Sequence, residues 1–191
     1  MFEIKTFFEL HSYEYTDPYY VNNPEAKYIP LEDASELKGY FDHRKFTPEH
    51  IQMLITIKYQ NIDVVGIGAP SGLDLWNDYL TAIEEYLDED NVSVIFATDP
   101  ILLKFESKDD KKLEFSIQDE WEPVKVYAQA LLPEEDFFDA LLTGAEQFWN
   151  TLKNYRVFEE KEIRESTPKN IPDLRIEQIQ VMRKKIKTLW K

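Results

Sequence analysis

The chain has 191 residues, of which 43% are hydrophobic and 14% aromatic, and its formal net charge at pH 7 is −15. This length predicts one domain with a substantial core, and the aromatic content argues against general disorder. Cysteine is absent, which excludes disulfides, thiolate metal sites and thiol nucleophiles. We find no signal-peptide pattern and no apolar run near the roughly 18 residues that a membrane span needs, so we expect a cytoplasmic protein.

The negative charge is unevenly distributed along the chain. Residues 1–152 carry 31 acidic and 11 basic side chains, a balance of −20, whereas residues 153–191 carry 6 and 11, a balance of +5. The acidic body should repel nucleic acids and anionic membranes, which bind through Lys and Arg, and should attract basic proteins. Solubility alone is the alternative reason for such a surface.

The first part of the chain predicts strands around an irregular segment. Residues 2–11 alternate between an apolar and a polar row, as expected of a half-buried strand. The rows are Phe2, Ile4, Phe8 and Leu10, and Glu3, Lys5, Glu9 and His11. Prolines break residues 16–50, although a short helix is expected over 31–41. Two β-rich runs joined at Gln60 and Asn61 predict a hairpin.

Helical and extended patterns alternate in the middle of the chain. Apolar residues three and four apart predict an amphipathic helix, with the stripe Leu73, Trp76, Leu80, Ile83 and Leu87. Residues 88–91 end this helix, and residues 92–98 have the composition of a buried strand. Alternation on both sides of a turn at 108–111 predicts a hairpin, and residues 124–132 predict a further strand.

The last part of the chain predicts two helices. The first begins at Pro133, with acidic residues in its first turn, and its apolar stripe is Phe138, Leu141, Ala145, Phe148 and Leu152. The second is basic and has the apolar seam Ile179, Met182, Ile186 and Leu189.

These elements together predict an α+β fold, with a mixed or mainly antiparallel sheet of about six strands covered by two to three amphipathic helices. We expect an acidic α+β domain over 1–155, a connector over 156–172 and a basic C-terminal helix over 173–191. Because the helix and the body carry opposite charges, we expect the helix to dock on the same domain. Self-association through this helix is the alternative, and the oligomeric state is left open.

The stretch "DVVGIGAPSGL" at 63–73 is the most site-like segment of the sequence. Three glycines between an apolar run and a helix suggest a phosphate-binding loop, with Gly66, Gly68, Gly72 and Asp99 as candidate cofactor-binding residues. Against this, Pro70 removes a backbone donor, and both the Walker lysine and the standard glycine spacing are missing. We favour a helix start in which Ser71 is the N-cap and Asp74 completes a capping box.

Other catalytic or metal chemistry finds little support in the sequence. The three histidines are His11, His43 and His50, and their spacing is not typical of a zinc site. Asp42 and Glu49 could supply oxygen ligands, which leaves metal binding as an alternative to solvated loop histidines. No hydrolase, kinase, metalloprotease or EF-hand motif occurs. We therefore predict no catalytic residue, no metal and no cofactor.

Acidic and tyrosine-rich segments are the best candidates for a binding surface. Tyrosine gives a large contact area at low entropic cost, and clustered carboxylates attract basic partners. The candidate partner-binding residues are Tyr15, Tyr19, Tyr20, Glu84, Glu85, Asp88, Asp119, Glu120 and Glu122. The alternative is that the tyrosines pack under a loop and that the acids are solvated caps and turns.

The leading hypothesis is a non-catalytic, acidic protein-binding module. By composition it is typical of an inhibitor or a bacterial immunity-type protein that occludes a basic partner such as a nuclease toxin. The alternatives are a nucleotide- or small-ligand-binding protein or enzyme that uses the 66–72 loop, and an assembly component that oligomerises through the C-terminal helix.

Overall fold

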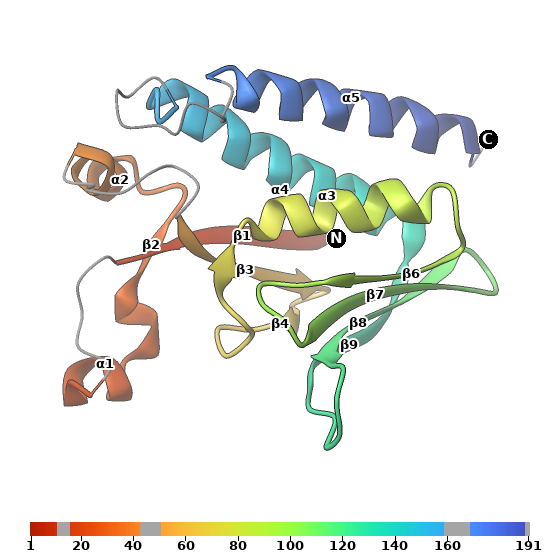
Figure 1. The fold of residues 1–191 in the computed structure, drawn as a ribbon, viewed down its shortest axis with the longest axis horizontal. Helices are drawn as coiled ribbons and strands as arrows, with labels where there is room; N and C mark the ends of the chain where they lie inside the picture. Colours follow the sequence, from red (N-terminus) through yellow and green to blue (C-terminus); the bar gives the residue numbers. More distant parts are fainter. Residues whose placement is uncertain (11–15, 43–50, 159–168, 190–191) are drawn as a thin grey trace.

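The computed structural model describes residues 1–10, 16–42, 51–158 and 169–189, and places their strands in two antiparallel sheets (Figure 1). The first sheet has the order β2-β1-β3-β4, with β5 beside β3, and the second has the order β6-β7-β8-β9. The strands are β1 (Phe2–Glu9), β2 (Tyr28–Pro30), β3 (Gln52–Tyr59), β4 (Ile62–Val65), β5 (Gly72–Leu73), β6 (Asn91–Ile95), β7 (Ile101–Lys108), β8 (Lys112–Asp119) and β9 (Val126–Pro133). The helices are α1 (Pro18–Asn22), the 3-10 helix η1 (Pro24–Lys27), α2 (Ala34–Asp42), α3 (Leu75–Tyr86), α4 (Glu134–Asn154) and α5 (Ile171–Leu189).

The predicted α+β class and antiparallel pairing are confirmed, but the strands form two sheets rather than one. The chain leaves the first sheet through β5 and α3 and begins the second sheet at β6. Each sheet is therefore built mainly from neighbouring segments of the chain. The sheets meet where β9 lies beside β4.

Both predicted hairpins are present. Gln60 and Asn61 have φ values of 51° and 66° and join β3 to β4, as a two-residue type I′ turn requires. In the second sheet, Lys108 pairs with Lys112 across the β7–β8 turn, and Phe105 pairs with Phe115 on the buried face. These pairings are local, which is why alternation and turn residues identified them.

The strand β6 differs from its prediction as a buried strand. It forms one edge of the second sheet and pairs only with β7 among the described strands. Val92 is buried, whereas Ile95 is 57% exposed. One face of β6 is therefore solvated, as in an antiparallel edge strand.

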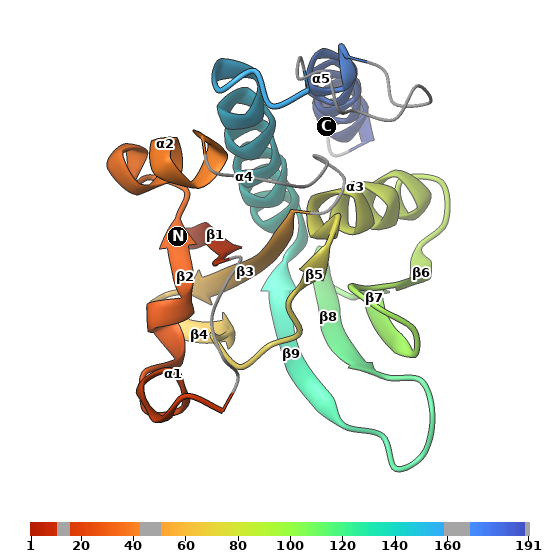
Figure 2. The ribbon, with the colours of Figure 1, turned by 60° about the vertical axis from the view of Figure 1, so that its left-hand side comes forward.

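Helices cover the same side of both sheets (Figure 1 and Figure 2). Helix α3 packs on β6 and β7, and α4 runs over β1 and reaches β9. Phe137 of α4 joins the sheets, because its ring centroid is 5.3 Å from that of Phe2 in the first sheet and 5.3 Å from that of Phe115 in the second. The whole predicted stripe of α4 is buried.

The contact of α3 with α4 and β1 depends on a glycine. Trp76 is fully buried and its Nε1–H donates to Thr6 Oγ1 at 3.1 Å. A Cβ on Gly144 of α4 would lie 2.6 Å from Trp76 Cη2 and 3.3 Å from Ile4 Cγ2. Glycine at this position therefore lets α4 approach the tryptophan ring closely.

Helix α5 forms a further layer, along α4 and against α3. Ile179, Met182 and Ile186 are buried at this contact, whereas Leu189, the last residue of the predicted seam, is 56% exposed. Val157 and Phe158, in the segment predicted as a polar connector, are buried. Residues 159–168 lie outside the described part of the chain.

The glycine segment does not form the predicted capping box. Ser71 Oγ–H instead donates to Glu9 Oε2 at 3.4 Å and accepts a hydrogen bond from Gln52 Nε2 at 3.5 Å, so it is bound to the first sheet. Asp74, in the left-handed region at φ 57°, occupies the N-cap without a side-chain cap hydrogen bond. Its carbonyl accepts from Asn77 N and Asp78 N at 2.7 and 3.1 Å. The helix therefore begins later than the local pattern suggested, because β5 holds Gly72 and Leu73 against β3.

Candidate functional site

Two loops meet at one end of the second sheet. The β8–β9 loop projects away from the helices (Figure 1), and the backbone N–H of Glu120 in this loop donates to Pro100 O of the β6–β7 loop at 2.8 Å. Asp119 N also donates to Lys125 O at 2.9 Å across the base of the β8–β9 loop. Asp99 thus comes next to the acidic stretch around residue 120. We name the acidic loop surface by its members, Asp99, Asp119, Glu120, Trp121 and Glu122.

An exposed aromatic side chain lies among these carboxylates. Trp121 is 63% exposed, although large aromatic side chains are usually buried in protein cores. In the sheet next to these loops, one row across the outer face contains Ile95, Leu102, Gln118 and Val126, three of which are apolar. Ile95 and Val126 are about half exposed. An exposed apolar patch with a charged rim is typical of a protein interaction site.

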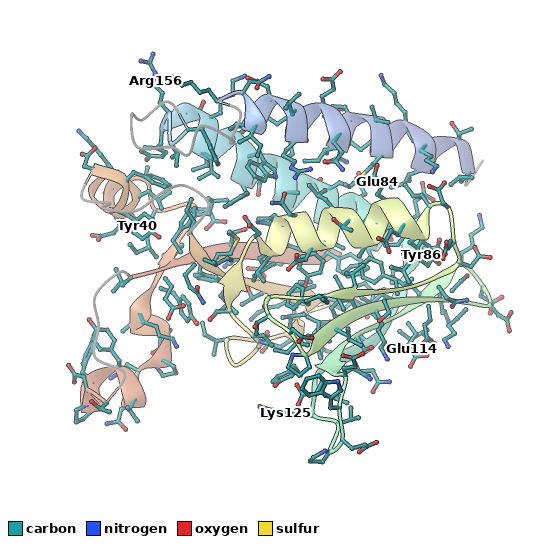
Figure 3. The ribbon with its side chains drawn as sticks, in the orientation of Figure 1. Tyr40, Glu84, Tyr86, Glu114, Lys125 and Arg156 are labelled. Atoms are coloured by element: carbon teal, nitrogen blue, oxygen red, sulfur yellow. The ribbon has the colours of Figure 1, made fainter. Side chains whose placement is uncertain are left out.

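The same end of the sheet already holds one cationic side chain. Lys125 Nζ lies 4.4 Å from the ring centroid of Tyr127, whose O–H donates to Asp119 Oδ1 at 3.0 Å. Loss of hydration, together with the hydrogen bond to Asp119 and its charge, raises the pKa of Tyr127 above its ordinary value. Figure 3 shows Lys125 at the base of the projecting loop. An aromatic ring next to a carboxylate is thus shown to accommodate an ammonium group here.

The β6–β7 loop is fixed from beneath by α3. Ala97 N–H donates to Asp78 Oδ2 at 3.0 Å. Burial of Asp78 raises its pKa to about 6, against the opposing effect of the Ala97 hydrogen bond and with a smaller contribution from Asp74. A Cβ on Gly72 would lie 2.7 Å from Ala97 Cβ, so β5 also packs closely against this loop. Asp99 is therefore carried on an anchored segment.

The tyrosines predicted to bind a partner lie on α1. Asp17 accepts from Tyr19 N at 2.8 Å and caps this short helix, and Tyr19 is 59% exposed. The rings of Tyr19 and Tyr20 are 5.2 Å apart. Helix α1 and the acidic loop surface both project away from α3, α4 and α5 (Figure 2). Tyr15 lies outside the described residues.

The predicted acidic group at the C-terminal end of α3, which includes Asp88 just beyond the helix, has a different environment, because it faces α5. Glu84 Oε2 accepts from Gln178 Nε2 at 2.8 Å, and Asp88 forms an ion pair with Lys185. Figure 3 shows Glu84 on the side of α3 that is turned towards α5. Glu85 is exposed. Two of these three acids therefore serve an internal helix contact.

The candidate cofactor residues do not come together as a nucleotide site. Strand β5 pairs with β3 in the first sheet, whereas β6 belongs to the second, so the parallel βαβ unit that such a site needs is not formed. A Cβ on Gly66 or Gly68 would meet no atom within 4 Å, whereas Gly72 is needed for its contact with Ala97. Asp99 belongs instead with residues 119–122.

Other titratable groups are buried at contacts between helices. Tyr86 and Glu134 are both almost fully buried where α3 meets the start of α4, and burial raises the pKa of Tyr86 to about 12 and that of Glu134 above its ordinary value. Within the described ranges, no group of three or more His, Asp or Glu side chains is placed to hold a metal ion. His11, His43 and His50 lie outside those ranges. Among the described helices, none combines the length and apolar character needed to cross a membrane.

The sequence identified the carboxylates of this surface, but neither Trp121 nor the apolar and aromatic side chains in the adjacent sheet. Trp121 stands in the stretch "DEWEP", and a tryptophan between acids was the signal that sequence reasoning left unused. Ile95 and Tyr127 had no comparable signal, because only the sheet register places them beside the loops. Comparison of the chain with protein-family models, curated proteins and solved structures gave no match.

Proposed function

We propose that this protein is a non-catalytic binding module that recognises a basic protein partner through the acidic loop surface. The observation that carries the proposal is the exposed Trp121 between carboxylates. It stands in the loop that follows Asp119, whose carboxylate accepts from Tyr127, a tyrosine that already contacts a lysine. Aromatic anchors surrounded by polar residues dominate the binding energy of many protein interfaces. An inhibitor or immunity-type protein that covers a basic cleft is the class that fits this surface.

The mechanism is electrostatic and steric. The net charge of −15 accelerates the encounter with a cationic protein. Trp121 and the apolar row from Ile95 to Val126 then exclude water, while the carboxylates of Asp119, Glu120 and Glu122 face Lys or Arg side chains. Helix α1, which carries the exposed Tyr19, also lies away from α3, α4 and α5 (Figure 2), and would extend the contact of a large partner.

A lysate pull-down tests this function. The wild-type chain is immobilised, exposed to lysate of the cells that express it at low salt, and eluted with a salt gradient that is read by mass spectrometry. We expect one basic protein at a stoichiometric level, released as salt screens the charges. Trp121→Ala should weaken its retention by about tenfold or more, the loss typical of a hot-spot aromatic.

The matched control for that variant is Leu131→Ala, because Leu131 is 54% exposed on β9 but lies away from the β8–β9 loop. This variant should retain the same protein as the wild type does. Absence of any salt-released basic protein, or equal loss with both variants, would contradict the proposed function.

A further inference from the structure

One edge of β1 is open along half of its length. Strand β3 pairs with β1 from Phe2 to Phe8, whereas β2 pairs only with residues Phe7 to Glu9. Leu31 N also donates to Thr6 O at 2.8 Å. Among the described residues, no strand pairs with residues 2–5 on the β2 side. An unpaired strand edge is a template for another strand.

The direction of the backbone groups along this edge follows from the pairing. Thr6 O and Leu10 N bond towards β2, and Met1 O bonds to Gln60 N on the β3 side. Since alternate residues of a strand point their N–H and C=O groups to opposite sides, those of Phe2 and Ile4 point to the open edge. An added strand therefore finds a continuous set of donors and acceptors.

A hollow of about 470 Å³ follows the same edge. It lies between β1 and α4, and its walls include Ile4, Glu32, Ala140, Thr143 and Gln147. Figure 1 shows β1 running beneath α4. Because side chains on a strand alternate between its two faces, every second side chain of an added strand would enter this hollow.

We propose that an extended segment of a protein partner adds a strand to the open edge of β1, with its inward side chains in the hollow under α4. A second copy of the chain does not fit this edge. Helix α4 packs directly on β1, so two copies paired about a two-fold axis would bring their α4 helices to about one strand spacing, ~5 Å. Packed helices need about 8–10 Å between their axes.

The charges at the edge determine the kind of segment. Glu3 and Lys5 form an ion pair of 2.7 Å on the exposed face, and their side chains are about half exposed. The charge of Glu32 contributes to raising the pKa of Lys5, after the larger effects of Glu3. Lys58 and Asp63 of β3 and β4 also act on Glu3, so three acids stand against two bases here. On a chain of net charge −15, this balance favours a segment with basic outward side chains and small apolar inward ones.

This inference is independent of the proposed function. The open edge belongs to the first sheet, whereas the acidic loop surface belongs to the second. Addition of a strand also relies on backbone hydrogen bonds and on side-chain pockets rather than on one aromatic anchor.

The test uses a defined probe, an eight-residue peptide of alternating lysine and valine with blocked ends. Titration of the full chain, followed by NMR, should give a 1:1 complex with the largest amide shifts at Phe2 and Ile4. The same peptide N-methylated at alternate residues cannot donate to the edge and should bind at least tenfold more weakly. A glutamate–valine peptide should also bind more weakly, because of the charge of the edge.

Variants on α4 give a second readout. Ala140→Tyr fills the hollow and should reduce peptide affinity at least tenfold, whereas Asn150→Tyr, at an exposed position of α4 outside the hollow, should leave it unchanged. Thermal unfolding confirms that both variants are folded. Equal affinity for the N-methylated peptide, or shifts confined to residues 119–127, would overturn the proposal.

Discussion

The acids that face α5 and the acids of the acidic loop surface look alike in sequence but differ in their partners. At the helices, Asp88 pairs with Lys185, and Arg183 pairs with Asp139 and Glu146. Among the described residues, no ion pair involves the carboxylates of the acidic loop surface. Asp119 accepts from the hydroxyl of Tyr127, and Glu122 Oε2 accepts from the backbone N–H of Val124 at 3.3 Å.

This difference shows which carboxylates of the chain form ion pairs within the molecule. Helix α5 forms ion pairs with two carboxylates of α4 and with Asp88, which follows α3. Its apolar seam, Ile179, Met182 and Ile186, is buried at the same contact. In the part of the chain that the structure describes, no basic element forms ion pairs with the loops at the end of the second sheet. Uncompensated carboxylates beside exposed aromatic and apolar side chains remain available to another molecule.

The largest expected effect is a loss of stability from a substitution in the apolar seam of α5. Ile179→Ala should lower the free energy of unfolding by about 2–5 kcal/mol, because it leaves a cavity at a fully buried position. Urea unfolding measures this change. Val181→Ala, at a position 58% exposed on the same helix, is the control and should stay within about 0.5 kcal/mol of wild type. Equal effects of the two substitutions would show that α5 is not packed through this seam.

The next effect concerns the support of the acidic loop surface. Gly72→Ala should destabilise the protein by about 1–3 kcal/mol, because the new methyl group would collide with Ala97. Gly68→Ala adds a methyl group in open space, and should be neutral or stabilise by up to about 1 kcal/mol through the unfolded chain. Thermal unfolding distinguishes the two. Equal values would contradict close packing of β5 against the β6–β7 loop.

A smaller effect depends on pH and on the carboxyl beneath the same loop. Because burial raises the pKa of Asp78 to about 6, the unfolded chain loses this proton at lower pH than the folded chain does. The Asp78 contribution to the free energy of unfolding is therefore complete below about pH 4 and falls as pH rises to about 6.

Asp78→Asn removes the buried charge and keeps an oxygen that accepts from Ala97 N–H. It should stabilise the protein by about 1–2 kcal/mol at pH 8 and have little effect at pH 4. Chemical unfolding at the two pH values checks this. A stabilisation that is independent of pH, or a loss of stability at pH 8, would show that Asp78 is not held with a raised pKa.

The smallest expected effect is on the free energy of unfolding, and it is measured by neutralising one acid from each region. Asp88→Asn removes the ion pair with Lys185 and should cost up to about 1 kcal/mol at low salt. Glu120→Gln removes an exposed carboxylate next to other acids and should cost nothing. The difference should disappear in high salt, where such pairs are screened. A loss with Glu120→Gln of similar size would mean that the two regions are not electrostatically different.

Local patterns in the sequence predicted the parts of the fold that depend on neighbouring residues. The apolar stripe of α4 and the turn at Gln60 and Asn61 are examples, because helical and strand periodicity record which face is buried. The start of α3 could not be predicted in this way. Ser71 and Asp74 have the spacing of a capping box, but a tertiary contact takes the Ser71 hydroxyl to Glu9 instead.

The charged residues of the candidate site could be predicted from the sequence. The way in which the fold brings them together could not. The acids at 119–122 are evident in the sequence, whereas Asp99 was assigned to a different site and joins them only through the hydrogen bond of Glu120 N to Pro100 O. Glu84 and Asp88 had the same sequence signal as Asp119 and Glu122. Only the placement of α5 shows that their charges are engaged within the molecule.

The most direct test of the acidic loop surface compares two triple variants of equal composition and net charge. Asp119→Asn, Glu120→Gln and Glu122→Gln neutralise the loop acids. Glu84→Gln, Glu85→Gln and Asp88→Asn neutralise the acids at and just beyond the end of α3, and we call this second protein the α3 variant. The measurement is the association rate of each with the basic protein retained from lysate, at low and at high salt. We predict that the loop variant associates much more slowly at low salt, whereas the α3 variant stays close to wild type. Equal slowing of both would show that only the net charge of the chain matters, and would contradict a defined binding surface at the loops.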